Sequence, residues 1–234
     1  MVIYVVGVGP GDPEYLTLRG YRVIRGCGVV AGWRSVVERF MPLLVGKRVV
    51  VLSYGDEEEK LTELAEVGRI VDVAVLVHGD PSVSDWQFIE KVRRVARDRG
   101  VGVEVVPGVS SLNVLLARLG LDMAFVGFVT LHVRGDVSRM LSDLLAILRM
   151  GRVAVVIPEP RGDGPQRVAR FLRENGLECS AVVFERLTYG DEWVRYYEDL
   201  DSLISEDREF SDLVIMAVFP RQSRPELGAA LVRR

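Results

Sequence analysis

Residues 5–20, V-V-G-V-G-P-G-D-P-E-Y-L-T-L-R-G, decide the fold of this chain. The β-branched start predicts a strand that runs directly into Gly7, Gly9 and Gly11, where the missing Cβ atoms let the backbone turn sharply and approach a ligand. A proline just beyond the glycines is typical of the first turn of a helix, and Asp12 is placed to cap that turn. A strand, a glycine turn and a helix in this order predict the first unit of an α/β sheet.

The same alternation continues through the first half of the chain. Short apolar, β-branched runs predict strands at residues 2–6, 29–31, 48–52, 73–77 and 103–106. Between them, apolar residues three and four apart predict crossover helices near 16–24, 57–67 and 86–99. Crossover helices join parallel strands, so we expect a mainly parallel sheet.

A second series of elements follows residue 120. The pattern predicts an amphipathic helix at 110–119 that ends at Gly120, then strands at 125–131, 152–157, 181–184 and 213–219, with helices near 139–148 and 166–174. Residues 189–197 are expected to add an antiparallel strand, so the second sheet is mixed. We therefore expect two α/β domains, residues 1–112 and 113–234, and attach no function to the tail from residue 221.

Two further loops follow predicted strands of the first domain. They are V-L-V-H-G-D-P-S-V at residues 75–83 and E-V-V-P-G-V-S-S-L at residues 104–112. Open α/β sheets bind ligands at the carboxyl ends of their strands, so these loops suggest a shared site. The simpler reading is also open: Asp80 can bond its own turn, His78 can be held by hydrogen bonds, and Ser110 or Ser111 can cap a helix.

Composition limits the classes of function. The net charge of −3 argues against a dedicated nucleic-acid binder, which needs a basic face. The basic residues are almost all Arg, which suits carboxylate recognition but equally fits genome composition or heat adaptation. Cys27 and Cys179 lack metal-ligand spacing, so we expect two buried, reduced thiols and no metal site. The chain shows no basic leader and no apolar run of the roughly 18 residues that span a bilayer, so we expect a cytoplasmic protein without membrane contact.

Six segments together resemble the tetrapyrrole methylase superfamily. Three lie in the first half: V-G-V-G-P-G-D-P at residues 6–13, H-G-D-P-S-V at 78–83 and V-V-P-G-V-S-S at 105–111. Three lie in the second: T-L-H-V-R-G-D at 130–136, A-V-V-I-P-E-P-R at 154–161 and E-R-L-T-Y-G-D-E at 185–192. The second set is similar to the cobalt-precorrin-7 (carbon 5) methyltransferase branch, and the likeness covers about residues 1–220.

The resemblance implies an S-adenosylmethionine-dependent methyltransferase acting on a cobalt-precorrin in cobalamin biosynthesis. It places the methyl donor in a cleft between the two domains, against these matching positions: Pro10, Gly79, Asp80, Val83, Ser110, Ser111, Ile157 and Leu187. The tetrapyrrole carries many carboxylates, for which the candidate contacts are Gly9, Gly11, Arg118, Arg134 and Arg161. Asp12 and His132 are the candidates to take the proton lost on carbon methylation. A homodimer is implied as well, whereas a separate carbon 15 methylase and decarboxylase is a partner that the sequence leaves open.

Three alternatives stay open. The second choice within the superfamily is a diphthine synthase or a methylase of another ring carbon, although a diphthine synthase usually has an Asn-Ala-Ser segment where this chain has residues 107–111, P-G-V-S-S. A dinucleotide-binding oxidoreductase would need an acid at the end of the second strand, where residues 29–34 read V-V-A-G-W-R, and Asp12 would repel a pyrophosphate. A binding module with a degenerate site is the third.

Overall fold

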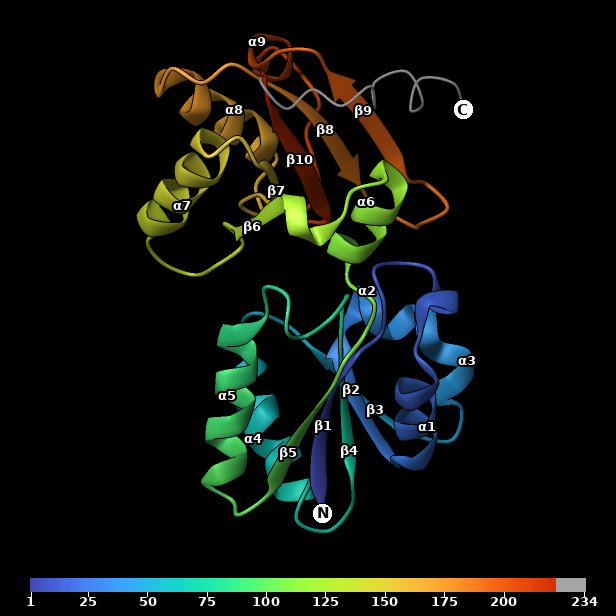
Figure 1. Cartoon of the computed structure of the whole chain (residues 1–234). Coiled ribbons are helices and arrows are strands. Elements are labelled where there is room, and N and C mark those ends of the chain that lie inside the picture. Colours follow the sequence, from blue (N-terminus) through green and yellow to red (C-terminus); the bar gives the residue numbers. More distant parts are fainter. Residues whose placement is uncertain (222–234) are drawn as a thin grey trace. The chain divides into compact units, whose positions relative to one another are not determined.

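The computed structural model describes residues 1–221, so residues 222–234 of the tail lie outside the described part. The chain divides into two compact units, Met1–Ser110 and Ser111–Arg234. The division falls two residues before the boundary expected from sequence. Each unit is an α/β structure with its own sheet and core (Figure 1).

The first unit contains five strands in the order β3-β2-β4-β1-β5, and every paired neighbour is parallel. The strands are β1 (Val2–Gly7), β2 (Val29–Trp33), β3 (Arg48–Leu52), β4 (Val73–Val77) and β5 (Gly102–Val106). All five residues of β4 are buried, as expected of a central strand covered on both faces. The parallel sheet predicted from the alternating pattern is confirmed.

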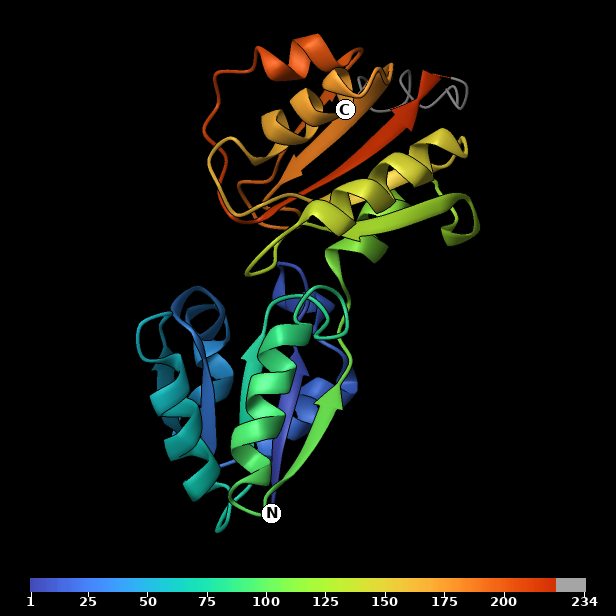
Figure 2. The ribbon, with the colours of Figure 1, turned by 90° about the vertical axis from the view of Figure 1, so that its left-hand side faces the viewer.

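Helices cover both faces of this sheet. They are α1 (Leu18–Gly26), α2 (Arg34–Val37), α3 (Met41–Leu44), α4 (Glu57–Val67) and α5 (Trp86–Arg97). The apolar stripes of α4 and α5 pack in one core cluster, which includes Leu61, Leu64 and Val92. Residues of α1, α2 and α3 form the cluster on the other face, which includes Ile24 and Val36. Figure 2 shows α5 lying along the strands that it covers.

The second unit contains a mixed sheet in the order β6-β7-β10-β8-β9. Its strands are β6 (Val126–Thr130), β7 (Val153–Ile157), β8 (Cys179–Glu185), β9 (Trp193–Tyr197) and β10 (Val214–Pro220). Only β6 and β7 are parallel to each other among the pairs of this sheet within residues 1–221. Its helices are α6 (Ser111–Leu119), α7 (Ser138–Arg149), α8 (Gly164–Glu174) and α9 (Leu200–Ile204), and residues of α7, α8 and α9 share one core cluster with the sheet.

Some elements differ from the prediction. The helices α2, α3 and α9 were not predicted, because four or five residues are too few to show a helical period. The antiparallel strand β9 begins at Trp193 rather than at residue 189, because residues 189–192 form a turn in which the Glu192 N–H donates to the Tyr189 carbonyl at 3.1 Å. Cys27 and Cys179 are free and buried as predicted, and burial raises the pKa of each thiol to about 11.

Candidate functional site

The three glycine loops of the first unit meet at the carboxyl edge of its sheet. They follow β4, β1 and β5, which are adjacent strands. The Gly79 N–H donates to the Gly9 carbonyl at 2.8 Å, and the Gly9 N–H donates back to the Gly79 carbonyl at 3.3 Å. Two motifs that are 70 residues apart in sequence are thereby joined into one structure.

Close packing explains why two of these positions must be glycine. A Cβ on Gly7 would lie 2.7 Å from the Gly108 nitrogen and equally close to the Gly79 oxygen. A Cβ on Gly108 would lie 2.7 Å from the Gly7 carbonyl, and nearer still to Gly79. Real Cβ atoms do not approach backbone this closely, so the glycines at these positions allow the loops to contact one another.

Asp80 connects the second and third loops. Its carboxylate accepts the Ser82 N–H at 2.7 Å, which is the turn geometry that the simpler reading predicted. The other carboxylate oxygen accepts the Gly108 N–H at 3.2 Å. Asp80 therefore holds the second and third loops together, and it is also a candidate contact for the methyl donor.

Asp12 caps a shorter element than expected. Its carboxylate accepts the Glu14 N–H at 2.8 Å and caps a 3₁₀ turn at Pro13–Tyr15. The first α-helix begins only at Leu18, where Thr17 is the N-cap and its hydroxyl accepts the Gly20 N–H at 3.0 Å. The expectation that a helix starts directly after the glycine loop is thus corrected, because a separate capping residue starts α1.

A second acid at this edge was missed from the sequence. Asp85 is the N-cap residue of α5, and its half-buried side chain makes no cap hydrogen bond. Burial, with a smaller contribution from the charge of Asp80, raises the pKa of Asp85 to about 7. The preceding Ser84 has φ 84°, a backbone conformation that is costly for a residue with a side chain. The only sequence signal was its position five residues after Asp80.

The predicted segments of the second unit also share one sheet edge. Because β10 is antiparallel to both β7 and β8, its start lies beside their carboxyl ends. His132 follows β6, Ile157 ends β7, and Asp212 precedes β10. Burial lowers the pKa of His132, and the charge of Asp212 offsets part of this effect.

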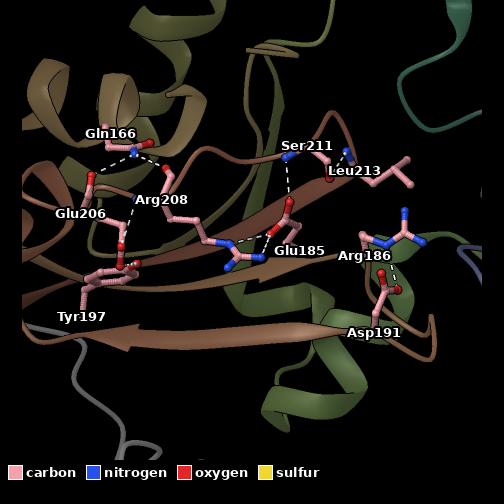
Figure 3. Close-up of polar contacts among 9 residues, drawn as sticks. All are labelled: Gln166, Glu185, Arg186, Asp191, Tyr197, Glu206, Arg208, Ser211 and Leu213. Atoms are coloured by element: carbon pink, nitrogen blue, oxygen red, sulfur yellow. Dashed lines mark hydrogen bonds and ion pairs between the residues drawn. The ribbon is translucent and has the colours of Figure 1, made fainter. Parts of the chain in front are cut away.

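The segment after β8 is held by polar contacts (Figure 3). Buried Glu185 accepts the Ser211 N–H at 2.7 Å and two bonds from Arg208 at 2.7 and 2.8 Å. Burial raises the pKa of Glu185, but the hydrogen bonds from Ser211 and Arg208 outweigh burial and lower it overall. Gln166 donates to the carbonyls of Glu206 and Arg208 at 3.2 and 3.0 Å, which fixes the segment that carries Arg208.

Leu187 is buried at the turn that these contacts support. On one side of it, Arg186 binds Asp191 at 2.8 Å. On the other, the Thr188 N–H donates to Glu192 at 2.7 Å. These two contacts stabilise the positive φ angles of Arg186 and Thr188 on either side of Leu187. Backbone conformations of this kind are concentrated at functional sites.

The candidate arginines differ in their surroundings. Arg118 binds Glu192 with nitrogen–oxygen distances of 3.1 and 3.5 Å, and Arg161 lies 3.7 Å from Glu159. Arg134 is exposed in the loop after β6, two residues beyond His132. Arg118 and Arg161 each face an acid in their own unit, and all three arginines stay candidates for a substrate carboxylate.

No helix within residues 1–221 is both long enough and apolar enough to span a membrane. The same part of the chain contains no cluster of three or more His, Cys, Asp or Glu side chains that could hold a metal ion.

Comparison with known proteins gives consistent results. A precorrin-4 C(11)-methyltransferase of Pseudomonas aeruginosa is 29% identical over 211 residues, which cover 82% of this chain and 78% of the relative. A probable cobalt-precorrin-7 C(5)-methyltransferase of Methanocaldococcus jannaschii is 27% identical over 206 residues, covering 82% and 86%. The crystal structure of a precorrin-6Y methylase from Archaeoglobus fulgidus superimposes with a TM-score of 0.65 at 26% identity, covering 94% of this chain and 98% of that one.

These similarities and the two-sheet fold define an α/β methyltransferase. The profile of the family described as Tetrapyrrole (Corrin/Porphyrin) Methylases matches residues 2–199, and the chain belongs to that family. The recognition made from the six sequence segments is confirmed. The individual residue roles remain predictions.

Proposed function

We propose that this enzyme transfers a methyl group from S-adenosylmethionine to a ring carbon of a cobalt-precorrin in cobalamin biosynthesis, with carbon 5 of cobalt-precorrin-7 as the favoured target. The observation that carries the proposal is the meeting of the three glycine loops at the carboxyl ends of β4, β1 and β5. That edge is where open α/β sheets bind their ligands.

The candidate donor contacts of the first unit form one continuous set. An ideal Cβ on Gly79 would lie 3.8 Å from the Ser110 Cα, so these two positions are neighbours with ordinary spacing between them. Asp80 follows Gly79 in the chain, and its carbonyl accepts the Val83 N–H at 2.9 Å. Pro10 follows Gly9, which is paired with Gly79. Backbone groups and small side chains of this kind let a folded ligand approach closely and can bond its polar groups, and the proposal gives the same role to Ser111, Ile157 and Leu187.

The main tasks of the protein's own residues are to orient the methyl donor and the ring carbon and to accept the proton that this carbon loses. S-adenosylmethionine, when bound, supplies a methyl group already activated by a sulfonium, so the protein needs no nucleophile of its own. Holding the reacting atoms in line and excluding water can account for much of the rate. Asp12, or the imidazole of His132, whose pKa is lowered by burial, then takes the proton that leaves the methylated ring carbon.

Recognition of the tetrapyrrole is assigned to groups that bind carboxylates. Arg134 offers a planar fork that can hold two carboxylate oxygens at once. Arg118 and Arg161 would first have to exchange Glu192 and Glu159 for substrate. The Gly9 N–H already donates to the Gly79 carbonyl. At Gly9 the loop therefore offers the substrate room for close approach and no additional hydrogen-bond donor.

Carbon 5 is favoured by the segments at residues 130–136 and 185–192 and by the similarity to the methanogen protein. The Pseudomonas relative carries the name of a carbon 11 methylase, so that position is the second candidate.

The test combines donor binding with product analysis. Calorimetric titration of the purified protein with S-adenosylmethionine should show saturable binding. Incubation with ¹³C-methyl-labelled donor and each cobalt-precorrin should then give a mass gain of one methyl group with cobalt-precorrin-7, and carbon NMR should place the label on carbon 5. Label on carbon 11 of a precorrin-4 would move the assignment to the second candidate. Methylation of a translation-factor peptide with no tetrapyrrole methylation would overturn the proposal in favour of diphthine synthesis.

A further inference from the structure

Arg39 lies against the glycine loop of the first unit, although it belongs to none of the six motif segments. It is part of the 3₁₀ turn at Glu38–Phe40, which follows β2 and α2. Strand β4 separates β2 from β1, so this connection comes from a strand that is not paired with β1. Even so, the Arg39 Nη1 donates to the carbonyl of Gly11, and the side chain is half-buried.

The guanidinium of Arg39 donates hydrogen bonds to two backbone carbonyls. Its Nε donates to the Ser35 carbonyl at 3.1 Å, and its Nη1 donates to Gly11. The carbon at its centre lies 5.8 Å from the centroid of the Phe40 ring, and Phe40 is itself buried. A planar fork fixed at one end by its own segment can hold a carbonyl at the other end in a defined direction.

The two halves of the glycine loop depend on different contacts. The first half is fixed by the paired backbone bonds between Gly9 and Gly79. The second half contains Gly11 and Asp12, where the contacts include the Asp12 cap on Glu14 and the bond from Arg39 to Gly11. The Gly11 carbonyl belongs to the peptide that joins Gly11 to Asp12, so its direction helps to set where the Asp12 side chain begins.

We propose that Arg39 is a positioning residue for Asp12: it holds the Gly11–Asp12 peptide so that the carboxylate can take the proton from the methylated ring carbon. This inference rests on the proposed function. It assigns to Arg39 an effect on turnover of the tetrapyrrole and no contact with the methyl donor.

The experiment compares Arg39→Met, Arg39→Lys and the control Arg22→Met, whose exposed arginine lies on α1 of the same unit. Arg39→Met should lower kcat for cobalt-precorrin methylation at least tenfold, while the calorimetric dissociation constant of S-adenosylmethionine changes less than twofold. Arg39→Lys, which keeps a cation able to reach one carbonyl, should recover part of the loss. Arg22→Met should behave as the unmodified enzyme.

Two further measurements separate positioning from simple structural support. If Arg39 acts through Asp12, the double variant Arg39→Met/Asp12→Asn should be little slower than Asp12→Asn alone. Hydrogen exchange should be faster in Arg39→Met at the amides of Gly11 and Asp12, whatever the substrate of the enzyme proves to be.

The inference is overturned if Arg39→Met keeps its kcat, if donor affinity falls along with turnover, or if the two losses multiply in the double variant. Failure of the unmodified enzyme to methylate any cobalt-precorrin would instead count against the proposed function. The hydrogen-exchange result would still decide whether Arg39 holds the loop.

Discussion

At the scale of single residues, Gly108 shows how closely the three loops of the first unit are packed. We expect Gly108→Ala to lower the free energy of unfolding by about 2–3 kcal/mol, since its Cβ would overlap backbone of Gly7 and Gly79 that cannot move aside. Urea denaturation measures the change. The matched control is Gly26→Ala at the end of α1, where nothing lies within 4 Å of an added Cβ, and where Ala should be neutral or stabilising by up to about 1 kcal/mol. Equal effects at the two positions would contradict this account of the loops.

Asp85 gives a residue-scale prediction about pH. Its pKa is raised from 3.8 to about 7 in the folded protein, so between these values the folded state holds a proton that the unfolded state releases. Stability from this group is therefore full below about pH 4 and is lost as the pH rises through 7. We expect Asp85→Asn to be more stable than the unmodified protein at pH 8, by roughly 2–4 kcal/mol at most, and to differ little near pH 4.

Thermal unfolding from pH 4 to pH 8 checks this prediction for Asp85. The control is Glu90→Gln, an exposed acid on the same helix, which should leave the pH dependence unchanged. A pH profile that is the same with and without the Asp85 carboxyl would show that the group is not desolvated in the folded state.

For several site residues, the sequence indicated the kind of interaction they make but not the residues with which they make it. The sequence predicted that Asp80 either stabilises its own turn or contacts the methyl donor. The structure shows the turn hydrogen bond together with a hydrogen bond from Gly108, 28 residues away. No local pattern predicts that second bond, because it depends on β4 and β5 flanking β1. Arg39 was missed for the same reason, because it contacts a loop that is distant in sequence. Asp85 was missed because its burial, the main cause of its raised pKa, is not visible in the local sequence.

At the scale of elements, α4 and α5 are joined by a buried ion pair. The Lys91 amine lies 2.7 Å from a Glu57 carboxylate oxygen, and the two side chains are 18% and 3% exposed. We expect Lys91→Met to cost about 2–4 kcal/mol, because the Glu57 charge would lose a cation in a place that water barely reaches. The control is Arg94→Met on the same helix: its pair with Glu58 is exposed on both sides, so the loss should stay below about 1 kcal/mol. Chemical denaturation of both variants gives the comparison, and equal costs would refute the role of burial.

Elements with a clear hydrophobic pattern were predicted well from sequence, and the shortest helices were not. Helix α4 and strands β3 and β4 have the bounds that were expected, since α4 shows a helical period and each of the two strands is an apolar run between polar or glycine-rich breaks. Helices α2 and α3 follow one another over residues 34–44 with a 3₁₀ turn between them, so no single period emerges there. Their position matters for function, because this irregular stretch carries Arg39.

At the scale of the whole molecule, each unit gathers its motif segments at one edge of its sheet. In the first unit this follows from parallel strands, whose carboxyl ends share an edge. In the second unit it follows from antiparallel pairing, which brings the start of β10 beside the ends of β7 and β8. The sequence predicted both sheets and the family. It could not predict Asp212 beside His132, since that pairing depends on strand order.

We predict that Arg134 of the second unit binds the tetrapyrrole and that the glycine loops of the first unit bind the methyl donor. Arg134, exposed after β6, is assigned to a tetrapyrrole carboxylate, whereas the glycine loops of the first unit are assigned to the donor. We expect Arg134→Met to raise the KM for the cobalt-precorrin by about tenfold or more, the loss of one charge-assisted hydrogen bond, with the affinity for S-adenosylmethionine unchanged. The control is Arg139→Met, an exposed arginine five residues further on in α7, which should change neither quantity. Steady-state kinetics and donor calorimetry on the same preparations provide the test. Because the two ligands are measured separately, an equal loss for both would show that Arg134 supports the site as a whole and does not select the substrate.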